Sequence, residues 1–177
     1  MPTRLVVISD THVPQRARRL PDELWRAIDQ AEVVVHAGDW NGIELLDELA
    51  ARSARLIAVR GNNDGPEFDA RLAEVAEADL EGVRVAVIHD SGAADGREAR
   101  MEARFPDADL LIFGHSHIPW DTTGPRGLRL LNPGSPTDKR RQPTGSYLAV
   151  TLDGGAVRSA ELIPLPYPPT VSHQNGR

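Results

Sequence analysis

The sequence predicts an α/β protein built on a parallel βαβαβ unit, and three observations lead to this fold class. Short apolar runs rich in β-branched residues alternate with segments whose apolar residues recur at helical spacing. Each of these apolar runs ends in a cluster of polar residues. Farther along the chain, Glu81-Gly82 and Asp153-Gly154-Gly155 separate paired strand-like runs, which predicts antiparallel hairpins and a second sheet.

The first third of the chain supplies the crossover unit. We expect strands at 5–8, 33–35 and 56–59, because each is a continuous apolar run of the kind found in strands buried on both faces. A helix is expected between the first two strands, beginning at Pro21, where proline is favoured in a first turn. A second helix is expected over 43–50. This alternation predicts right-handed parallel crossovers and a sheet covered by helices.

The rest of the chain is expected to add one helix and further strands. No internal repeat or coiled-coil pattern is present in the sequence. The predicted elements are a hairpin of 76–80 and 83–88, a helix over about 95–104, strands over 109–113 and 128–131, and a hairpin of 146–152 and 156–162.

Length and composition predict one globular domain. A chain of 177 residues with 40% hydrophobic and 26% charged residues can bury a single core. We expect this domain to cover residues 1–163. The segment 164–177 begins with several prolines and continues with polar residues, which favours a surface or disordered tail.

Charge and cysteine content exclude several kinds of site. The net charge of -6 argues against a general electrostatic hold on nucleic acid or on an anionic membrane. The chain has no cysteine, so disulfides, thiolate zinc sites and a cysteine nucleophile are excluded. No apolar run approaches the roughly 18 residues of a membrane helix, and the apolar run near Met1 is too short for a signal peptide. The expected location is therefore cytoplasmic.

Side chains that can bind metal ions follow the predicted strands. The carboxyl ends of strands in α/β sheets converge on one crevice, so these side chains are expected to lie close together. Imidazole and carboxylate groups suit first-row divalent metals, and an amide oxygen can add a further ligand. The residues are Asp10 and His12, Asp39, Asn62 with Asp64, His89, and His115 with His117.

This set is larger than one metal ion needs. Two ions that share Asp39 are the economical arrangement, because a bridging carboxylate can hold ions about 3.5–4 Å apart. Open coordination positions would then remain for a bridging hydroxide and for substrate oxygens. Each motif alone also has a structural explanation, since Gly38-Asp39 is ordinary turn chemistry and His89 alone is typical of a structural histidine. The ordered combination favours a metal centre.

The same ordered set resembles the calcineurin-like metallophosphoesterases, particularly their small single-domain phosphodiesterase branch. The resemblance covers residues 4–162, and it includes Asn132-Pro133-Gly134-Ser135. It implies a two-sheet β-sandwich flanked by helices. The motifs that carry it are Asp10-x-His12, Gly38-Asp39, Gly61-Asn62-x-Asp64, His89 and Gly114-His115-x-His117.

The resemblance also implies how the ligands are divided between two divalent ions. Asp39 would bridge the ions, which can be Mn, Fe, Ni, Co or Zn, because N and O ligands of this type accept all of them. Asp64 and His36 would orient ligands through hydrogen bonds. One ion would be held by Asp10, His12 and His117, and the other by Asn62, His89 and His115.

The implied reaction is hydrolysis of a phosphodiester, with a monoester as second choice, by attack of the bridging hydroxide on phosphorus. Asp39, Asn62, Asn63 and Asp64 are the residues expected to serve catalysis. Asn63 departs from the family pattern, because many members carry there a histidine proposed to protonate the leaving oxygen. Asp90 departs as well, since glycine commonly follows the ligand histidine. We expect its carboxylate to cap the next turn, although contact with a metal or repulsion of a phosphate is the alternative.

Two further groups of side chains could contact the substrate, but the sequence supports this less strongly. Trp40 and Trp120 follow ligand motifs and could stack on a base or sugar, but ordinary packing is the favoured interpretation. The basic residues of two loops could attract an anionic substrate, but solvated surface charge is favoured. These basic residues are Arg16, Arg18, Arg19, Lys139, Arg140 and Arg141.

Two other functions compete with a small-molecule phosphodiesterase. One is a non-catalytic scaffold, because a retromer subunit resembles this fold and lacks a working phosphoesterase centre; that function predicts substitutions among the ligand residues, and none is present. The other is a nuclease, which the acidic chain disfavours. We therefore expect a small phosphodiester or phosphate ester as substrate, no membrane, no nucleic acid, and a chain compatible with a homo-oligomer.

Overall fold

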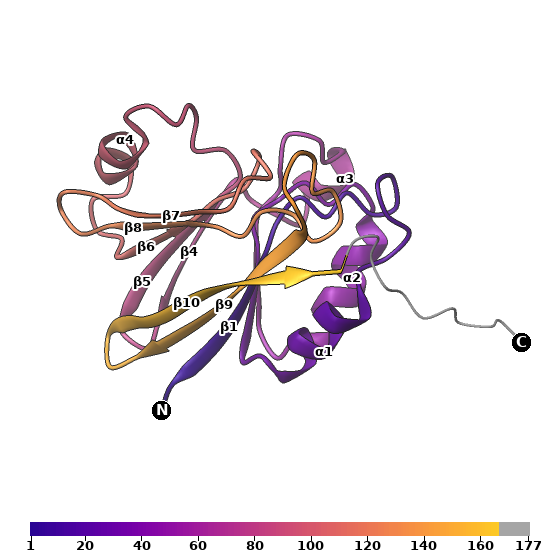
Figure 1. Ribbon diagram of the computed structural model, residues 1–177, viewed down its shortest axis with the longest axis horizontal. Coiled ribbons are helices and arrows are strands. Elements are labelled where there is room, and N and C mark those ends of the chain that lie inside the picture. Colours follow the sequence, from indigo (N-terminus) through magenta and orange to yellow (C-terminus); the bar gives the residue numbers. More distant parts are fainter. Residues whose placement is uncertain (167–177) are drawn as a thin grey trace, which may run out of the picture.

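Two five-stranded β-sheets face each other in the computed structural model, which describes residues 1–166 (Figure 1). Helices α1 and α2 cover the outer face of one sheet, and α4 covers the outer face of the other. The α/β sandwich flanked by helices is thus confirmed.

The first sheet contains the predicted crossover unit. Its order is β10-β9-β1-β2-β3, with β1, β2 and β3 mutually parallel and β9 antiparallel to β1. The C-terminal hairpin therefore joins the first sheet rather than the second. The strands are β1 (Thr3–Ile8), β2 (Val33–His36), β3 (Leu56–Ala58), β9 (Gly145–Asp153) and β10 (Ala156–Leu165), and the helices are α1 (Asp22–Gln30) and α2 (Ile43–Arg52).

The second sheet has the order β4-β5-β6-β8-β7. Strands β5, β6 and β8 are parallel, and β4 and β7 are antiparallel edge strands. The elements are β4 (Val75–Leu80), β5 (Val83–Ile88), β6 (Leu110–Ile112), β7 (Trp120–Thr123) and β8 (Arg129–Asn132), together with the helices α3 (Pro66–Asp69) and α4 (Arg97–Arg104).

Most element boundaries agree with the sequence within two residues, and the differences have local causes. Helix α4 begins two residues later than expected, because Gly96 has a φ of 65° and lies outside the helical region. Helix α3 and strand β7 were not predicted: α3 is shorter than two helical turns, and Trp120 is the only strongly apolar residue of β7. Strand β10 continues through Leu165, two residues past the expected domain boundary. Residues 167–177 of the predicted tail lie outside the described part of the chain.

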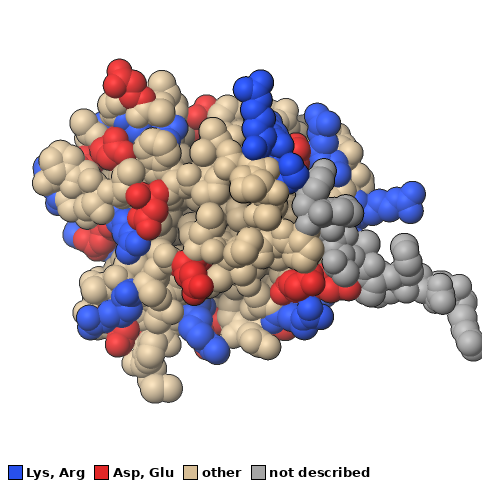
Figure 2. All heavy atoms as spheres, viewed as in Figure 1, with Lys and Arg blue, Asp and Glu red and all other residues tan. Residues whose placement is uncertain are grey.

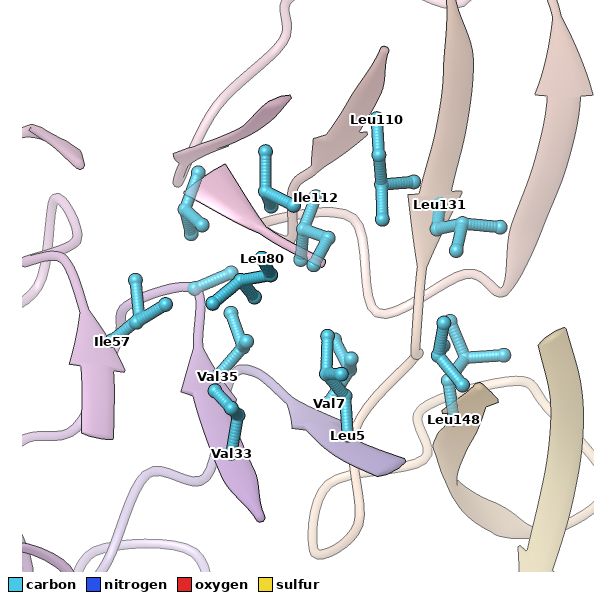
Figure 3. Close-up of a cluster of buried hydrophobic side chains, with 14 of the residues drawn as sticks. Leu5, Val7, Val33, Val35, Ile57, Leu80, Leu110, Ile112, Leu131 and Leu148 are labelled. Carbon is cyan, nitrogen blue, oxygen red and sulfur yellow. The ribbon is translucent and has the colours of Figure 1, made fainter. Parts of the chain in front are cut away.

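The main core lies between the two sheets, where apolar side chains from both inner faces interdigitate (Figure 3). The strand period of two decides which side chains enter it. In β1, Leu5 and Val7 face the second sheet, whereas Val6 and Ile8 face the helices α1 and α2. Because both faces of β1 are covered, its sequence is continuously apolar rather than alternating.

Charged side chains of both signs lie on the surface (Figure 2). On the face shown in Figure 2, acidic and basic side chains are interspersed. Within residues 1–166, no helix has the length and apolar content needed to cross a lipid bilayer. A cytoplasmic location and a homo-oligomer stay predictions from the sequence.

Truncating the core at Ile112 should destabilise the protein strongly. Ile112 is fully buried between the sheets, so Ile112→Ala removes apolar contacts and leaves a cavity that costs about 2–5 kcal/mol of unfolding free energy. Leu162→Ala is the matched control, because Leu162 is 44% exposed. Urea unfolding followed by circular dichroism measures both changes. Equal effects of the two substitutions would contradict the assignment of this core.

Candidate metal centre

The carboxyl ends of parallel strands from both sheets meet at one end of the sandwich. Strand β1 runs from the amino terminus toward this end (Figure 1). The loops that follow five strands bring the predicted ligands there: Asp10 and His12 follow β1, Asp39 follows β2, Asn62 follows β3, His89 follows β5, and His115 and His117 follow β6. The structure thus places all seven predicted ligands in neighbouring loops, as the strand-end argument requires.

One group of ligand atoms is formed by Asp10, His12 and His117, whose nitrogen and oxygen atoms lie within 4.8 Å of one another. The Nε2 atoms of His12 and His117 are 3.2 Å apart. Asp10 Oδ1 lies 3.5 Å from the Nε2 atom of His117 and 3.9 Å from that of His12. All three side chains are buried.

A second group surrounds His89. Its Nε2 atom lies 3.3 Å from Oδ1 of Asp39 and 3.9 Å from Oδ1 of Asp10. On its other side it is 3.3 Å from His115 Nδ1, which is in turn 3.0 Å from Asn62 Oδ1. Unlike the first group, this one has an open side, because Asn62 and His115 are exposed.

Asp39 connects the two groups. Its Oδ1 atom is the one near His89, and its Oδ2 atom lies 3.6 Å from His12 Nε2. Asp10 also reaches both groups through Oδ1, which the sequence did not predict, since it assigned Asp10 to one group only. The centre therefore has a carboxylate whose two oxygens face different histidines, as a bridging ligand requires.

In three of the four candidate ligand histidines, the outer nitrogen, Nδ1, faces an oxygen, which leaves the lone pair of the neutral imidazole on the inner nitrogen, Nε2. Nδ1 of His12 is 3.1 Å from Asn41 Oδ1, Nδ1 of His89 is 2.7 Å from the Ala37 carbonyl, and Nδ1 of His117 is 2.7 Å from the Asp138 carbonyl. These carbonyl oxygens can only accept, so the Nδ1 atoms donate. Metal-binding histidines are commonly held by outer hydrogen bonds of this kind.

This arrangement fits divalent cations. With both outer nitrogens donating, the Nε2 lone pairs of His12 and His117 face each other, which is unfavourable without a cation or a proton between them. Asp10 Oδ1 is buried and has no hydrogen-bond partner within the described residues. Ligands about 2.1 Å from a metal are themselves separated by about 3.0–3.4 Å, and the contacts here span 3.0–3.9 Å.

Most of the predicted ligands also have an unusual backbone conformation. Five of the seven predicted ligands have a positive φ, in the left-handed region that residues other than glycine rarely adopt. Such strain persists only where the surrounding structure enforces it, and it is concentrated at functional sites. The values are 56° for Asp10, 45° for His12, 61° for Asp39, 72° for His115 and 59° for His117.

Two glycines allow the loops to approach each other. A Cβ atom at Gly61 would collide with Asp39, and one at Gly114 would collide with Ser9 and Asp10. A side chain at either position would therefore push ligand loops apart. This explains in physical terms why glycine precedes both Asn62 and His115.

Asp64 and His36 hold the ligand loops rather than facing the centre. The carboxylate of Asp64 accepts hydrogen bonds from the backbone N–H groups of Asp39, Trp40, Asn41 and Gly61. His36 is buried, accepts the Gly38 N–H at Nδ1 and donates from Nε2 to Thr11 Oγ1. Both contacts agree with the predicted orienting roles, and Asp64 acts through the backbone of two ligand loops.

Asn63 and Asp90 occupy the two positions that depart from the family pattern. Asn63 donates its backbone N–H to Asp39 Oδ1 at 3.0 Å and its side-chain amide to Asp39 Oδ2 at 2.8 Å. Asp90 Oδ1 accepts the Gly92 N–H at 2.7 Å, which is the expected turn cap. Its Oδ2 atom lies 3.9 Å from Nε2 of His115, so this carboxylate also faces the outer nitrogen of a candidate ligand.

Several residues that support the centre were not predicted. Asn41 and the Asp138 carbonyl orient His12 and His117, and Ser135 Oγ donates to the Asp10 carbonyl at 2.8 Å. Asn132 donates to the Gly114 carbonyl at 3.0 Å. The signal for two of them was present in Asn132-Pro133-Gly134-Ser135, whereas nothing in the sequence distinguishes Asn41 or Asp138 from other loop residues.

The two tryptophans are packing residues. Trp40 is fully buried, stacks on His36 at 3.5 Å between ring centroids and donates from Nε1 to the Val59 carbonyl, so it cannot stack on a substrate. Trp120 lies under the guanidinium of Arg97, whose Cζ atom is 4.4 Å from the ring centroid. The packing interpretation, favoured from the sequence, accounts for both.

Two of the predicted basic loop residues, Arg140 and Arg16, lie close to the His117 side of the centre. The charge of Arg140 adds to burial in lowering the pKa of His117. The Nε atom of Arg16 is 3.8 Å from Asp138 Oδ2, and Asp138 is the residue whose carbonyl holds His117. Arg19 pairs with Asp22 at 3.6 Å, and Lys139 donates to the Gln142 carbonyl at 3.1 Å. These contacts are typical of surface charge, which was the favoured interpretation.

The pKa values reflect the burial of these groups and their closeness to one another. Burial raises the pKa of Asp10 to about 7, against the opposing charge of His89. Burial would lower the pKa of His89, but its hydrogen bond to Asp39 and the charges of Asp10 and Asp39 raise it to about 9. Burial would raise the pKa of Asp39, but hydrogen bonds from His89 and Asn63 bring that pKa below its usual range. Burial lowers the pKa of His117 to about 4.

The comparison with known proteins agrees with this site. Residues 3–155 match the family model described as the calcineurin-like phosphoesterase superfamily domain. The chain belongs to this superfamily. A probable metallophosphoesterase of Methanothermobacter thermautotrophicus is 34% identical over 159 residues, covering 89% of this chain and 90% of that protein. A second, from Methanocaldococcus jannaschii, is 33% identical over 162 residues, covering 90% of this chain and 80% of that protein.

Solved structures with the same fold include the Thermotoga maritima protein TM1076, with 35% identity and a TM-score of 0.73, covering 92% of this chain and 99% of that one. Vps29 from Chaetomium thermophilum has a TM-score of 0.80 at 18% identity, covering 96% of this chain and 95% of that one, and its likeness concerns the fold alone. Family membership and the candidate ligand groups together support a metal-dependent phosphoesterase.

Metal binding should release protons near neutral pH. In the metal-free protein at pH 7, His89 is protonated and Asp10 is about half protonated, and both must lose their protons to act as ligands. We expect about one to two protons to be released per protein at pH 7, and fewer as the pH rises above 9, so affinity should increase with pH over this range. Calorimetric titration with Mn²⁺ in two buffers of different ionisation enthalpy measures the number. Binding at pH 7 without proton release would contradict these pKa shifts.

Proposed function

We propose that the protein is a dinuclear metal-dependent phosphodiesterase. The observation that carries the proposal is the position of Asp39, whose two carboxylate oxygens face different groups of candidate ligands 3.3 and 3.6 Å away. One ion would be held by Asp10, His12, Asp39 and His117, and the other by Asp39, Asn62, His89 and His115. When bound, such ions supply Lewis acidity and a hydroxide nucleophile at neutral pH.

The shape of the site supports reaction at its open side. The first group of ligands is buried, whereas Asn62 and Asn63 of the second group are exposed and His115 has a side chain that is 45% exposed. A phosphate ester can therefore approach over these three residues. The rigid hydrogen bonds around the histidines keep the ligands in place while substrate oxygens enter, which is the preorganisation that charge stabilisation requires.

The reaction adds the oxygen of water to phosphorus and breaks the bond between phosphorus and the leaving oxygen. A phosphodiester then gives a phosphomonoester and an alcohol, with one proton of the water passing to the leaving oxygen or to solvent. Asn63 is an exposed amide next to the centre, and it can donate a hydrogen bond but no proton. The chain therefore favours esters whose leaving group departs as a stable anion.

A diester is preferred to a monoester because of the charge that the substrate brings. Asp10 and Asp39 would be neutralised by the ions that they bind, but the exposed Asp90 is not a proposed ligand, and a monoester dianion meets more repulsion from it than a diester monoanion does. A purely structural scaffold is the competing function. It gives no reason for a complete set of ligand side chains with a buried carboxylate oxygen that lacks a partner within the described residues.

Removing the bridge should reduce the metal content from two ions to at most one. Asp39→Asn leaves a neutral amide whose nitrogen cannot coordinate, so one of the two groups loses a shared charged ligand. We expect hydrolysis of bis(4-nitrophenyl) phosphate to fall by about 100-fold or more, as for loss of a major electrostatic element. Asp153→Asn, at the end of β9 and with a side chain that is 44% exposed, is the control. Metal analysis and turnover are measured together, and two bound ions with full activity in Asp39→Asn would refute the proposal.

The substitution Asn63→His should speed the hydrolysis of esters with poor leaving groups. The introduced imidazole could protonate the leaving oxygen, a contribution of about 100-fold for general acid catalysis. The measurement is the ratio of turnover for methyl and 4-nitrophenyl esters of the same phosphate in Asn63→His. Asn63→Ala is the control, because it removes the hydrogen bond to Asp39 without adding a proton donor. An unchanged ratio would show that the missing proton donor does not limit this enzyme.

A further inference from the structure

A cleft of about 210 Å³ opens beside the second group of candidate ligands. Asn62, His89 and the buried Ile88 are among the residues that line it. Because two of these are candidate ligands, the cleft offers space beside a phosphate bound over them for the group attached to that phosphate. The charged side chains of the cleft come from three different segments and are Arg60, Glu74, Asp90 and Arg104.

Two of these charged residues neutralise each other. The guanidinium of Arg60 donates to Glu74 Oε1 at 3.0 Å, and its Nε atom lies 3.3 Å from Asp69. The carboxylate of Glu74 and the cation of Arg60 are therefore already paired. Neither is available as the principal partner of a ligand.

Asp90 is engaged as well. One of its oxygens accepts the Gly92 N–H, and the other lies 3.9 Å from Nε2 of His115. The Nδ1 atom of His115 faces Asn62 Oδ1 at 3.0 Å, and its Nε2 atom is the one on the side of Asp90. The Asp90 carboxylate thus caps a turn and faces a candidate ligand, which leaves it poorly placed to bind a cationic group.

Arg104 is the remaining charge. It is the last residue of α4 and is exposed, and its guanidinium lies over the Phe105 ring with Cζ 5.2 Å from the centroid. Within residues 1–166, its guanidinium makes no hydrogen bond or ion pair. Stacking on an aromatic face restrains the guanidinium while leaving its N–H edge free, and this edge matches the geometry of a carboxylate or phosphate.

We infer that Arg104 is a specificity residue that binds a second anionic group of the substrate in this cleft. The substrate class is then a phosphate ester whose organic part carries a carboxylate or a further phosphate. This inference rests on the proposed function for the position of the reacting phosphate. It adds a recognition element on α4, a helix that contributes none of the metal ligands.

Binding of matched phosphonates to the Mn²⁺-loaded protein tests the inference without turnover. Each probe carries a methyl ester on one phosphonate, so that this end has a single negative charge like a phosphodiester. The ester of 3-phosphonopropionate carries a further carboxylate, that of propane-1,3-diphosphonate a further phosphonate, and that of propylphosphonate no second anionic group. We expect the wild type to bind the better of the two probes with a second anionic group about fivefold more tightly than the propylphosphonate ester, the effect of one exposed ion pair. The two probes together distinguish a carboxylate from a phosphate as the preferred group.

Substitution assigns the preference to one side chain. Arg104→Gln should abolish it and Arg104→Lys should retain part of it. Arg55→Gln should leave it intact, because Arg55 is an exposed arginine just before β3, at the opposite end of that strand from the ligands. Equal binding of all three probes by the wild type, or a preference that survives in Arg104→Gln, would overturn the inference.

Hydrolysis of bis(4-nitrophenyl) phosphate, which has no second anion, is measured on the same preparations. Activity on this diester without any preference among the phosphonates refutes the role of Arg104 and leaves the proposed function standing. A preference that depends on Arg104 in a protein without esterase activity supports the binding site and refutes the catalytic function. The two failures are therefore distinguishable.

Discussion

Lone pairs of carboxylate, imidazole and amide groups point into one small space at one end of the sandwich, and the surrounding structure has to oppose their mutual repulsion. Nε2 atoms of two buried histidines, His12 and His117, are 3.2 Å apart, with a buried oxygen of Asp10 beside them. In water these groups would separate and hydrate. In the interior, where the effective dielectric constant is lower, they stay together only because the backbone that carries them is fixed.

The fold fixes that backbone by cross-connecting loops from different strands. The carboxylate of Asp64 accepts hydrogen bonds from backbone N–H groups of two ligand loops, those after β2 and β3. On the far side, Ser135 and Asn132 fasten the loops after β1 and β6. The left-handed conformation of Asp10 and other ligands is the local cost of this arrangement, and the buried core of the sandwich provides the stability that offsets it.

Sequence patterns predicted the parts of this structure that repeat. Continuous apolar runs and helical periodicity predicted the crossover unit. Both patterns arise because the burial of side chains repeats regularly along a strand or a helix. They could not assign the C-terminal hairpin to its sheet, since pairing with β1 depends on contacts between residues far apart in sequence. Strand β7 escaped prediction for a similar reason: Asp121 and the threonines after it lie on an exposed edge, where pairing with β8 rather than burial makes the strand.

The ligand residues could be named from sequence because their chemical types are unusual after buried strands. Their supporting contacts could not. Asn41 and Asp138 are ordinary loop residues until the fold places one side chain and one carbonyl against histidine nitrogens. The position of Asp10 between the two groups of ligands likewise depends on the folded geometry. A motif that specifies only residue types does not predict it.

The place of β1 in its sheet has a consequence for how the chain folds. The strand synthesised first lies in the middle, between β2 and β9, so one of its edges stays unpaired until Gly145–Asp153 has left the ribosome. Contacts of such long sequence separation close late and slow the folding reaction. The loop that carries Ser135 and Asp138 arrives with the same segment. The hydrogen bond from Ser135 to the Asp10 carbonyl and the contact of the Asp138 carbonyl with His117 therefore form only after this segment has been synthesised.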